Sequence, residues 1–73
     1  MRTIRANIRR ILQKQGTFVI YDHQAEVMEG VLGEARERHI RAAVRELHQA
    51  GVTSCTGIGG KARQLRITPG PAA

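Results

Sequence analysis

The sequence predicts one small α+β domain with the element order α-β-α-α-β-β. Three observations carry this prediction: the length, two segments with apolar residues at helical spacing, and short β-branched runs between and after them. At 73 residues, a chain buries only about 60% of the surface that its unfolded form exposes, which leaves room for one core and no deep internal cleft. We therefore expect one domain over residues 1–68 and a tail over 69–73.

The first helix is expected over residues 2–15. Its apolar positions follow i, i+4, i+7 and i+8, the stripe of an amphipathic helix, and are Ile4, Ile8, Ile11 and Leu12. Gly16 stands where a helix commonly ends in a left-handed residue. The run TFVIY at residues 17–21 is short, continuous, β-branched and aromatic, which predicts a buried strand.

A second, short helix is expected within residues 22–33. Asp22 offers a side-chain oxygen as its N-cap. Gly30 weakens a helix by up to about 1 kcal/mol relative to alanine, and Gly33 marks the break after it. The expected apolar face consists of Ala25, Met28 and Leu32, with Val27 and Val31 beside it.

The longest helix is expected over residues 35–50, where Ile40, Val44 and Leu47 face the core and Gly51 ends the helix in the left-handed region. Two β-leaning runs, VTSCT and ARQLRIT, surround GIGGK, and this pattern predicts a β-hairpin. The proline-containing tail, residues 69–73, has no bulky apolar side chain and is expected to be disordered.

Charge and composition restrict the function. The net charge is +6, from 12 basic and 6 acidic residues, and the basic ends flank a mildly acidic middle, which favours a polyanionic partner. Aromatic residues make up 3% of the chain, too few for a platform that stacks single-stranded bases. A lone cysteine, Cys55, excludes an intramolecular disulfide and fits a reducing cytoplasm. No apolar run reaches the roughly 20 residues of a membrane span, although the basic N-terminus also suits a transit peptide or a surface-seeking helix.

The element order resembles the winged helix-turn-helix family of bacterial and phage DNA-binding regulators. Residues 39–67, HIRAAVRELHQAGVTSCTGIGGKARQLRI, look like that family's recognition helix, its leu-x-x-x-gly-val ending and its glycine-tipped basic wing. The similarity extends over residues 4–68. It implies a winged helix that places its third helix in the major groove of DNA and its wing on the adjacent backbone.

The third helix carries candidate base-reading residues. At 100° per residue, Arg38, Arg41 and Arg45 lie within about 60° of one another and more than 90° from the centre of the core-facing side. Arginine is the commonest specific base reader in the major groove, through its two-pronged contact with guanine. Arg36, near the helix start, could contact a phosphate or a base edge. The alternative is a solvated face in which these arginines pair with glutamates such as Glu34, Glu37 and Glu46.

The predicted hairpin carries a second set of cations, which are Lys61, Arg63 and Arg66. Exposed cations and backbone N–H groups suit phosphate oxygens or the minor groove, and no acidic residue follows Glu46. The alternative is a soluble sheet edge protected from aggregation by charge. The predicted helix over residues 2–15 has the densest charge. Its arginines could contact phosphates, bind an acidic protein surface or solubilise the domain.

Enzymatic and metal sites do not emerge from the sequence. The run TGIGGKA lacks the first glycine of a Walker A loop, the Ser or Thr after Lys61 and the strand-to-helix context. The spacings between His23, His39, His48 and Cys55 match no zinc pattern. We therefore expect no catalytic residues, no metal, no cofactor and no small-molecule ligand.

These observations predict a sequence-specific binder of double-stranded DNA that regulates transcription, with repression as the default mode. A homodimer on a short inverted repeat is expected because one small domain makes few base contacts, with helix 1 or residues 17–21 as the interface. Two rivals stay open: a protein-interaction adaptor or inhibitor that uses the same basic face, and a binder of structured RNA or ribosomes.

Overall fold

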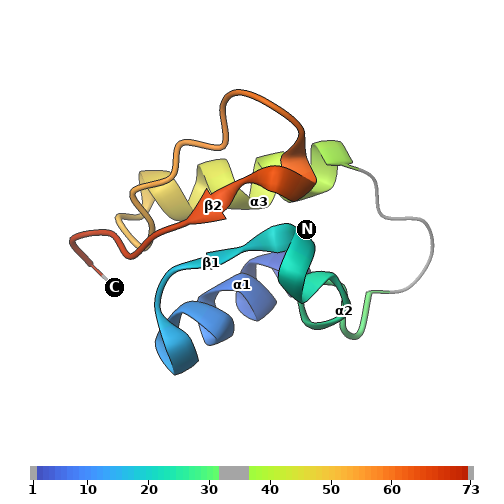
Figure 1. Cartoon of the computed structure of the whole chain (residues 1–73). Coiled ribbons are helices and arrows are strands. Elements are labelled where there is room, and N and C mark those ends of the chain that lie inside the picture. The colour runs from blue at the N-terminus through green and yellow to red at the C-terminus, as the bar shows by residue number, and fades with distance from the viewer. Residues whose placement is uncertain (1, 32–36, 73) are drawn as a thin grey trace.

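The computed structural model describes residues 2–31 and 37–72, and it confirms the α+β class (Figure 1). The elements, in chain order, are α1 (Arg2–Gln15), β1 (Phe18–Val19), the 3₁₀ turn η1 (Ile20–His23), α2 (Gln24–Val27), α3 (Glu37–Gln49), the 3₁₀ turn η2 (Ala62–Gln64) and β2 (Arg66–Ile67). The two strands form one antiparallel sheet. The predicted start of the third helix, residues 35 and 36, lies outside the described residues.

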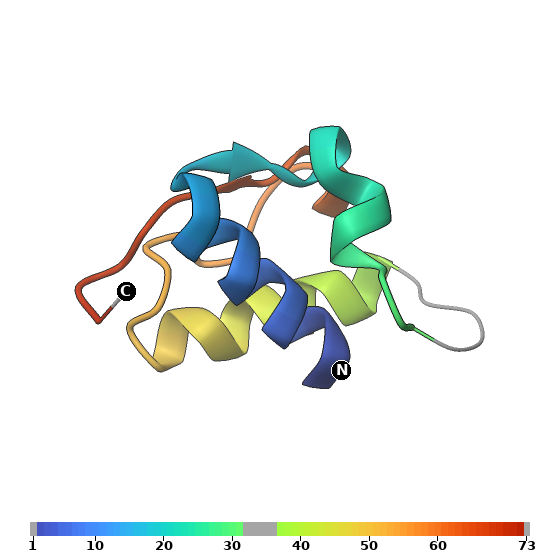
Figure 2. The ribbon, with the colours of Figure 1, turned by 90° about the horizontal axis from the view of Figure 1, so that it is seen from below.

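The core lies between α1, α3 and the sheet. Figure 2 shows the two long helices packed against each other, with the sheet on one side of the pair. The stripes predicted from helical spacing are buried in both helices, and α3 adds Ala43. Helix α1 has the predicted bounds, and Gly51 follows α3 with a φ of 78° as expected. Periodicity thus identified the two helices and the faces that they bury.

The second helix is short, as predicted, and Met28 and Val31 of its expected apolar side pack against the core. Its cap and the position of Ala25 are not those expected. Asp22 lies inside η1, and α2 begins after His23, with no side-chain hydrogen bond at the cap. Val27 is fully buried, whereas Ala25 is exposed. Because α2 is a single helical turn, it has no extended apolar stripe. The 3₁₀ turn that leads into it from β1 therefore determines which of its side chains face the core. Leu32, another residue of the predicted apolar face, lies outside the described residues.

The predicted strand at residues 17–21 is confirmed only at Phe18 and Val19, since Ile20 and Tyr21 belong to η1. The predicted hairpin does not form as a pair of neighbouring strands in the described residues. Strand β2 pairs with β1, with Phe18 opposite Ile67 and Val19 opposite Arg66, and the Ile20 N–H donates to the carbonyl of Leu65 at 3.1 Å. β2 is thus joined to the N-terminal half of the chain rather than to residues 52–56. Of the predicted hairpin only the base is paired, where the N–H of Ser54 donates to the carbonyl of Thr68 at 3.1 Å.

The tail is paired rather than disordered over residues 69–72. Pro69 forms an isolated antiparallel bridge with Thr53. The N–H of Gly70 donates to the carbonyl of Val52 at 2.9 Å, and that of Ala72 donates to the carbonyl of Gly51 at 2.7 Å. Composition could not indicate this pairing, because it uses backbone groups and needs no bulky side chain.

Replacing Gly70 by alanine should detach this tail. A Cβ at Gly70 would lie 2.4 Å from the Gly51 oxygen and 2.8 Å from the Thr53 nitrogen, so the two backbones must separate. Overpacking of this kind costs about 1–3 kcal/mol. The Ala72 amide should therefore exchange about 10 to 100 times faster in hydrogen-exchange NMR. Pro71→Ala, at an exposed position in the same tail, is the control, and equal protection in both variants would contradict the pairing.

Candidate nucleic-acid interface

Arg41 joins α3 to the glycine-rich loop, residues 55–61, that precedes η2. Its Nη1 donates to the carbonyls of Gly57, at 2.9 Å, and Gly59, at 3.0 Å, and its Nη2 donates to the carbonyl of Gly60. One guanidinium thus binds three carbonyls of a single loop. We predicted that Arg41 reads bases, but the loop carbonyls engage three of the five N–H donors of its guanidinium.

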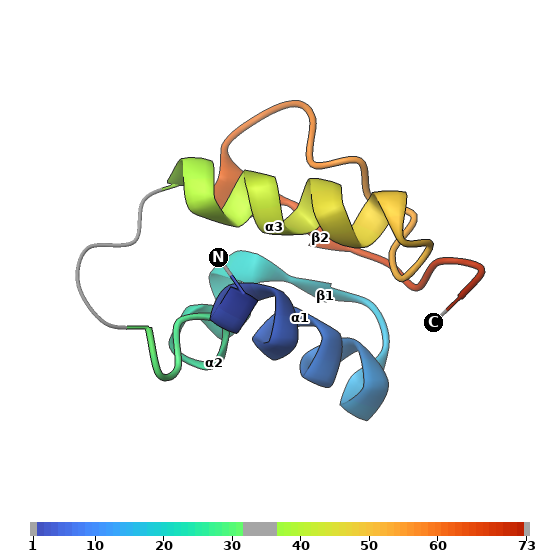
Figure 3. The same ribbon diagram turned by 180° about the vertical axis from the view of Figure 1, so that it is seen from behind.

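Gly57 fixes the loop directly on the helix. It is buried, and a Cβ at this position would lie 3.2 Å from the Arg41 oxygen and 3.5 Å from the Arg45 nitrogen. Its φ of +79° also favours glycine. Figure 3 shows the segment that contains the loop passing over α3 on the side away from α1. The loop therefore lies on the helix face that carries the candidate arginines.

Four other predicted cations lie on α3, at the end of the loop and in η2. Arg38 and Arg45 are exposed on α3, and Lys61 is exposed at the end of the loop. Arg63, in η2, is exposed and donates from Nη1 to Gln24 Oε1 at 2.5 Å. We call Arg38, Arg45, Lys61 and Arg63 the basic surface.

The remaining two predicted residues are not joined to this surface. Arg66 is exposed on β2, where it pairs with Val19, and no hydrogen bond or ion pair among the described residues joins its side chain to α3 or to the loop. Arg36 lies outside the described residues.

The glutamates of α3 do not neutralise the basic surface. Glu46 forms an ion pair with Arg5 of α1, with 2.9 Å between Oε2 and Nε. The i,i+4 pair of Glu37 with Arg41 is not formed, because Arg41 binds the loop. Over residues 2–31 and 37–72, no cation of the basic surface has a carboxylate within 4 Å. The predicted pairing of Arg41 with Glu37 is therefore wrong. Glu34, the predicted partner of Arg38, lies outside the described residues, so a solvated face stays open as the alternative.

Two of the arginines of α1 form ion pairs within the domain. Arg5 pairs with Glu46, and Arg10 contacts Glu29, with 3.4 Å between Nη2 and Oε2. Arg9 is exposed and makes no hydrogen bond or ion pair with the described residues. The N-terminal cluster therefore offers fewer unpaired cations to an anionic partner than the number of basic residues in the sequence suggests.

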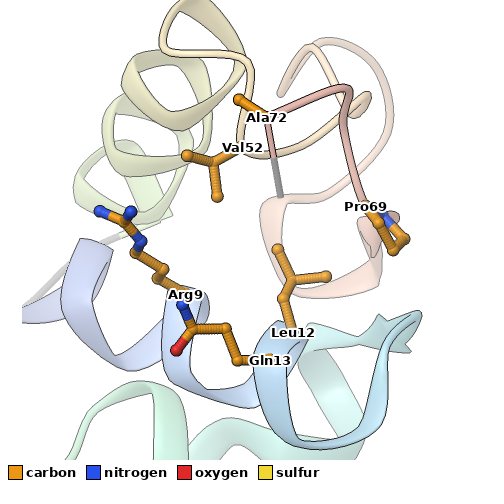
Figure 4. Close-up of a pocket in the computed structure, with 6 residues that line it drawn as sticks. All are labelled: Arg9, Leu12, Gln13, Val52, Pro69 and Ala72. Atoms are coloured by element: carbon orange, nitrogen blue, oxygen red, sulfur yellow. The ribbon is translucent and has the colours of Figure 1, made fainter.

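A hollow lies away from the basic surface, between α1 and residues 69–72. It has a volume of about 360 Å³, and Figure 4 shows the six residues that line it: Arg9, Leu12, Gln13, Val52, Pro69 and Ala72. A second, shallow hollow of about 290 Å³ shares Arg9 and Val52 with it. Both are open at the surface, and the Arg5–Glu46 ion pair lines the second.

Two of the histidines that were compared with zinc patterns make contacts within the domain. The ring of His23 meets Phe18 edge-on, with 5.3 Å between the ring centroids, and the ring of His48 contacts the Thr53 carbonyl through Nδ1 at 3.1 Å. Among the described residues, no three of the side chains His, Cys, Asp or Glu gather into a possible metal site. No helix in the described part of the chain is long and apolar enough to cross a bilayer.

Comparison with known proteins finds no family model, no curated protein and no solved structure that matches this chain. The function must therefore be argued from the residues. Sequence analysis found the cations of the surface, but it missed the role of Arg41 and the buried position of Gly57. A glycine beside Ile58 in an arginine-rich chain carries no local signal that it packs on a helix.

Proposed function

We propose that the chain binds double-stranded DNA through the basic surface and regulates transcription by occupying a promoter, with repression as the default mode. The observation that carries the proposal is the seating of the glycine-rich loop on the arginine face of α3. The loop contact thereby joins the segment that carries Lys61 to the helix that carries Arg38 and Arg45, and none of the three has a carboxylate partner within residues 2–31 and 37–72. Cations on such a surface displace the counterions that are condensed on the DNA phosphates, and this release supplies a large part of the affinity for DNA.

We further propose that the fold is a small winged helix-turn-helix, with α3 as the recognition helix and residues 52–68 as the wing. In support, β2 pairs with β1 on one side, while the residues just after it pair with Thr53 on the other. The wing is folded back onto α3 rather than extended. Base reading then falls to Arg38 and Arg45, and Arg41 becomes a positioning residue.

A homodimer on an inverted repeat is part of the proposal, because symmetric pairing doubles the base contacts. The apolar stripe of α1 is already buried in the core, which makes α1 the poorer of the two expected interfaces. Tyr21 is 64% exposed beside β1, which favours residues 17–21. Sedimentation of the chain with and without a duplex tests this, and Tyr21→Ser should weaken a dimer that uses this face.

The experiment that tests DNA binding is a titration of random duplex DNA at increasing salt. The logarithm of the affinity should fall with the logarithm of the salt concentration by about 0.9 for each phosphate contact. Lys61→Gln should reduce this slope by about 1 on every sequence, whereas Arg45→Gln should also change the preferred sites selected from a random library. Lys14→Gln removes an equal charge from the last turn of α1 and is the control.

Two outcomes would contradict the proposal. Absence of duplex binding at low salt would favour the protein-interaction module, with the basic surface on an acidic partner. An equal loss of slope in the Lys14 and Lys61 variants would show that net charge, rather than this surface, determines the binding.

A further inference from the structure

The peptide groups of the glycine-rich loop are oriented by Arg41. In a trans peptide, the carbonyl of one residue and the N–H of the next point in opposite directions. All described peptide bonds are trans, and the carbonyls of Gly57, Gly59 and Gly60 point to the Arg41 guanidinium. The N–H groups of Ile58, Gly60 and Lys61 must therefore point away from Arg41.

Two of these three N–H groups have no hydrogen-bond acceptor in the described part of the chain. The Ile58 N–H donates to Thr56 Oγ1 at 3.3 Å, whereas those of Gly60 and Lys61 donate to no described residue. Both residues are exposed. The Gly59 and Gly60 carbonyls both point to Arg41, so these two neighbouring N–H groups lie on the same, opposite side of the turn. Consecutive N–H groups in such a turn form a concavity that suits an anion.

The charges around these two amides favour an anion. The Arg41 guanidinium stands behind the loop and Lys61 adds its own ammonium, while residues 53–73 contain no acid. Glu37, one turn before Arg41 on α3, is the nearest acid along that helix, and it is exposed. Two cations and two N–H donors therefore outweigh one solvated carboxylate.

We propose that the amides of Gly60 and Lys61, with the Lys61 ammonium, bind a phosphate oxyanion. The proposal deepens the proposed function and rests on it for the source of the ligand, which would be a phosphodiester of the DNA backbone. Free phosphate has the same chemistry and serves as the probe. The site differs from a nucleotide-hydrolysing loop, because Ala62 supplies no hydroxyl and no strand leads into it.

The test is a titration of the ¹⁵N-labelled full chain, followed by amide NMR. Sodium phosphate at pH 7 is compared with sodium chloride at equal ionic strength, and then with a 12-base-pair duplex. We expect saturable downfield shifts of the Gly60 and Lys61 amides in phosphate and in duplex, but not in chloride. Lys61→Gln should weaken phosphate binding about 3- to 10-fold while the same two amides still respond, and Glu37→Gln should strengthen it.

The outcomes separate this site from DNA binding itself. Amides that respond to phosphate in a chain that binds no duplex would uphold the site and reject the proposed function. Duplex binding that leaves both amides unmoved would overturn the site and keep the function. Amides that move equally in chloride and phosphate would overturn the site, because the response would then be ionic strength alone.

Discussion

Replacing Asn7 by aspartate should lower the free energy of unfolding by about 3 kcal/mol. Asn7 is 4% exposed, and its Nδ2 donates to the carbonyls of Val27 and Glu29, both at 2.8 Å. Its Oδ1 accepts from Arg10 Nη2 at 2.6 Å. Aspartate keeps the shape and the Arg10 contact but places an oxygen against two carbonyl oxygens. Each acceptor left without a donor costs about 1–3 kcal/mol, and urea unfolding followed by far-UV circular dichroism measures the sum.

Gln13→Glu is the matched control for this prediction. It makes the same amide-to-carboxylate change on the same helix, at an exposed position, and surface substitutions of this kind stay within about 0.5 kcal/mol. Equal stabilities of the two variants would mean that Asn7 does not join α1 to the end of α2. Asn7→Ala removes the donors without adding a charge and should fall between them.

Replacing Arg41 by alanine should release the glycine-rich loop and weaken DNA binding more than the loss of one charge explains. Hydrogen bonds to a charged group contribute about 1.5–3 kcal/mol each when they are shielded, and Arg41 makes three at a half-buried position. We expect a loss of about 1–3 kcal/mol of stability and faster amide exchange across residues 57–61. Duplex affinity should fall at least 10-fold, because the loop no longer holds Lys61 in place.

Arg45→Ala is the control, since it removes the same charge from the same face of α3 but from a side chain without a described hydrogen bond. The Arg45 variant should keep the loop protected and lose affinity mainly through its own contact. If both variants exchange alike across the loop, Arg41 is a surface cation and its role as a positioning residue is wrong. Arg41→Lys keeps the charge without the planar fork, so it separates charge from geometry.

The sequence by itself determined the two long helices, the faces that they bury, the single core and the basic character of the chain. Ile4 and Ile8 on α1, and Ile40 and Val44 on α3, were identified because helical spacing is a local signal that burial then confirms. It also supplied every cation of the basic surface, since composition needs no structure.

Only the tertiary structure decided what those residues contact. The guanidinium of Arg41 could bind Glu37, a phosphate or a carbonyl, and the approach of Gly57 to α3 settles the choice. In the same way, β2 pairs with a strand nearly fifty residues earlier, and the tail pairs with residues 51–53. Backbone donors and acceptors are alike at every position, so their partners depend on which segments the core brings together.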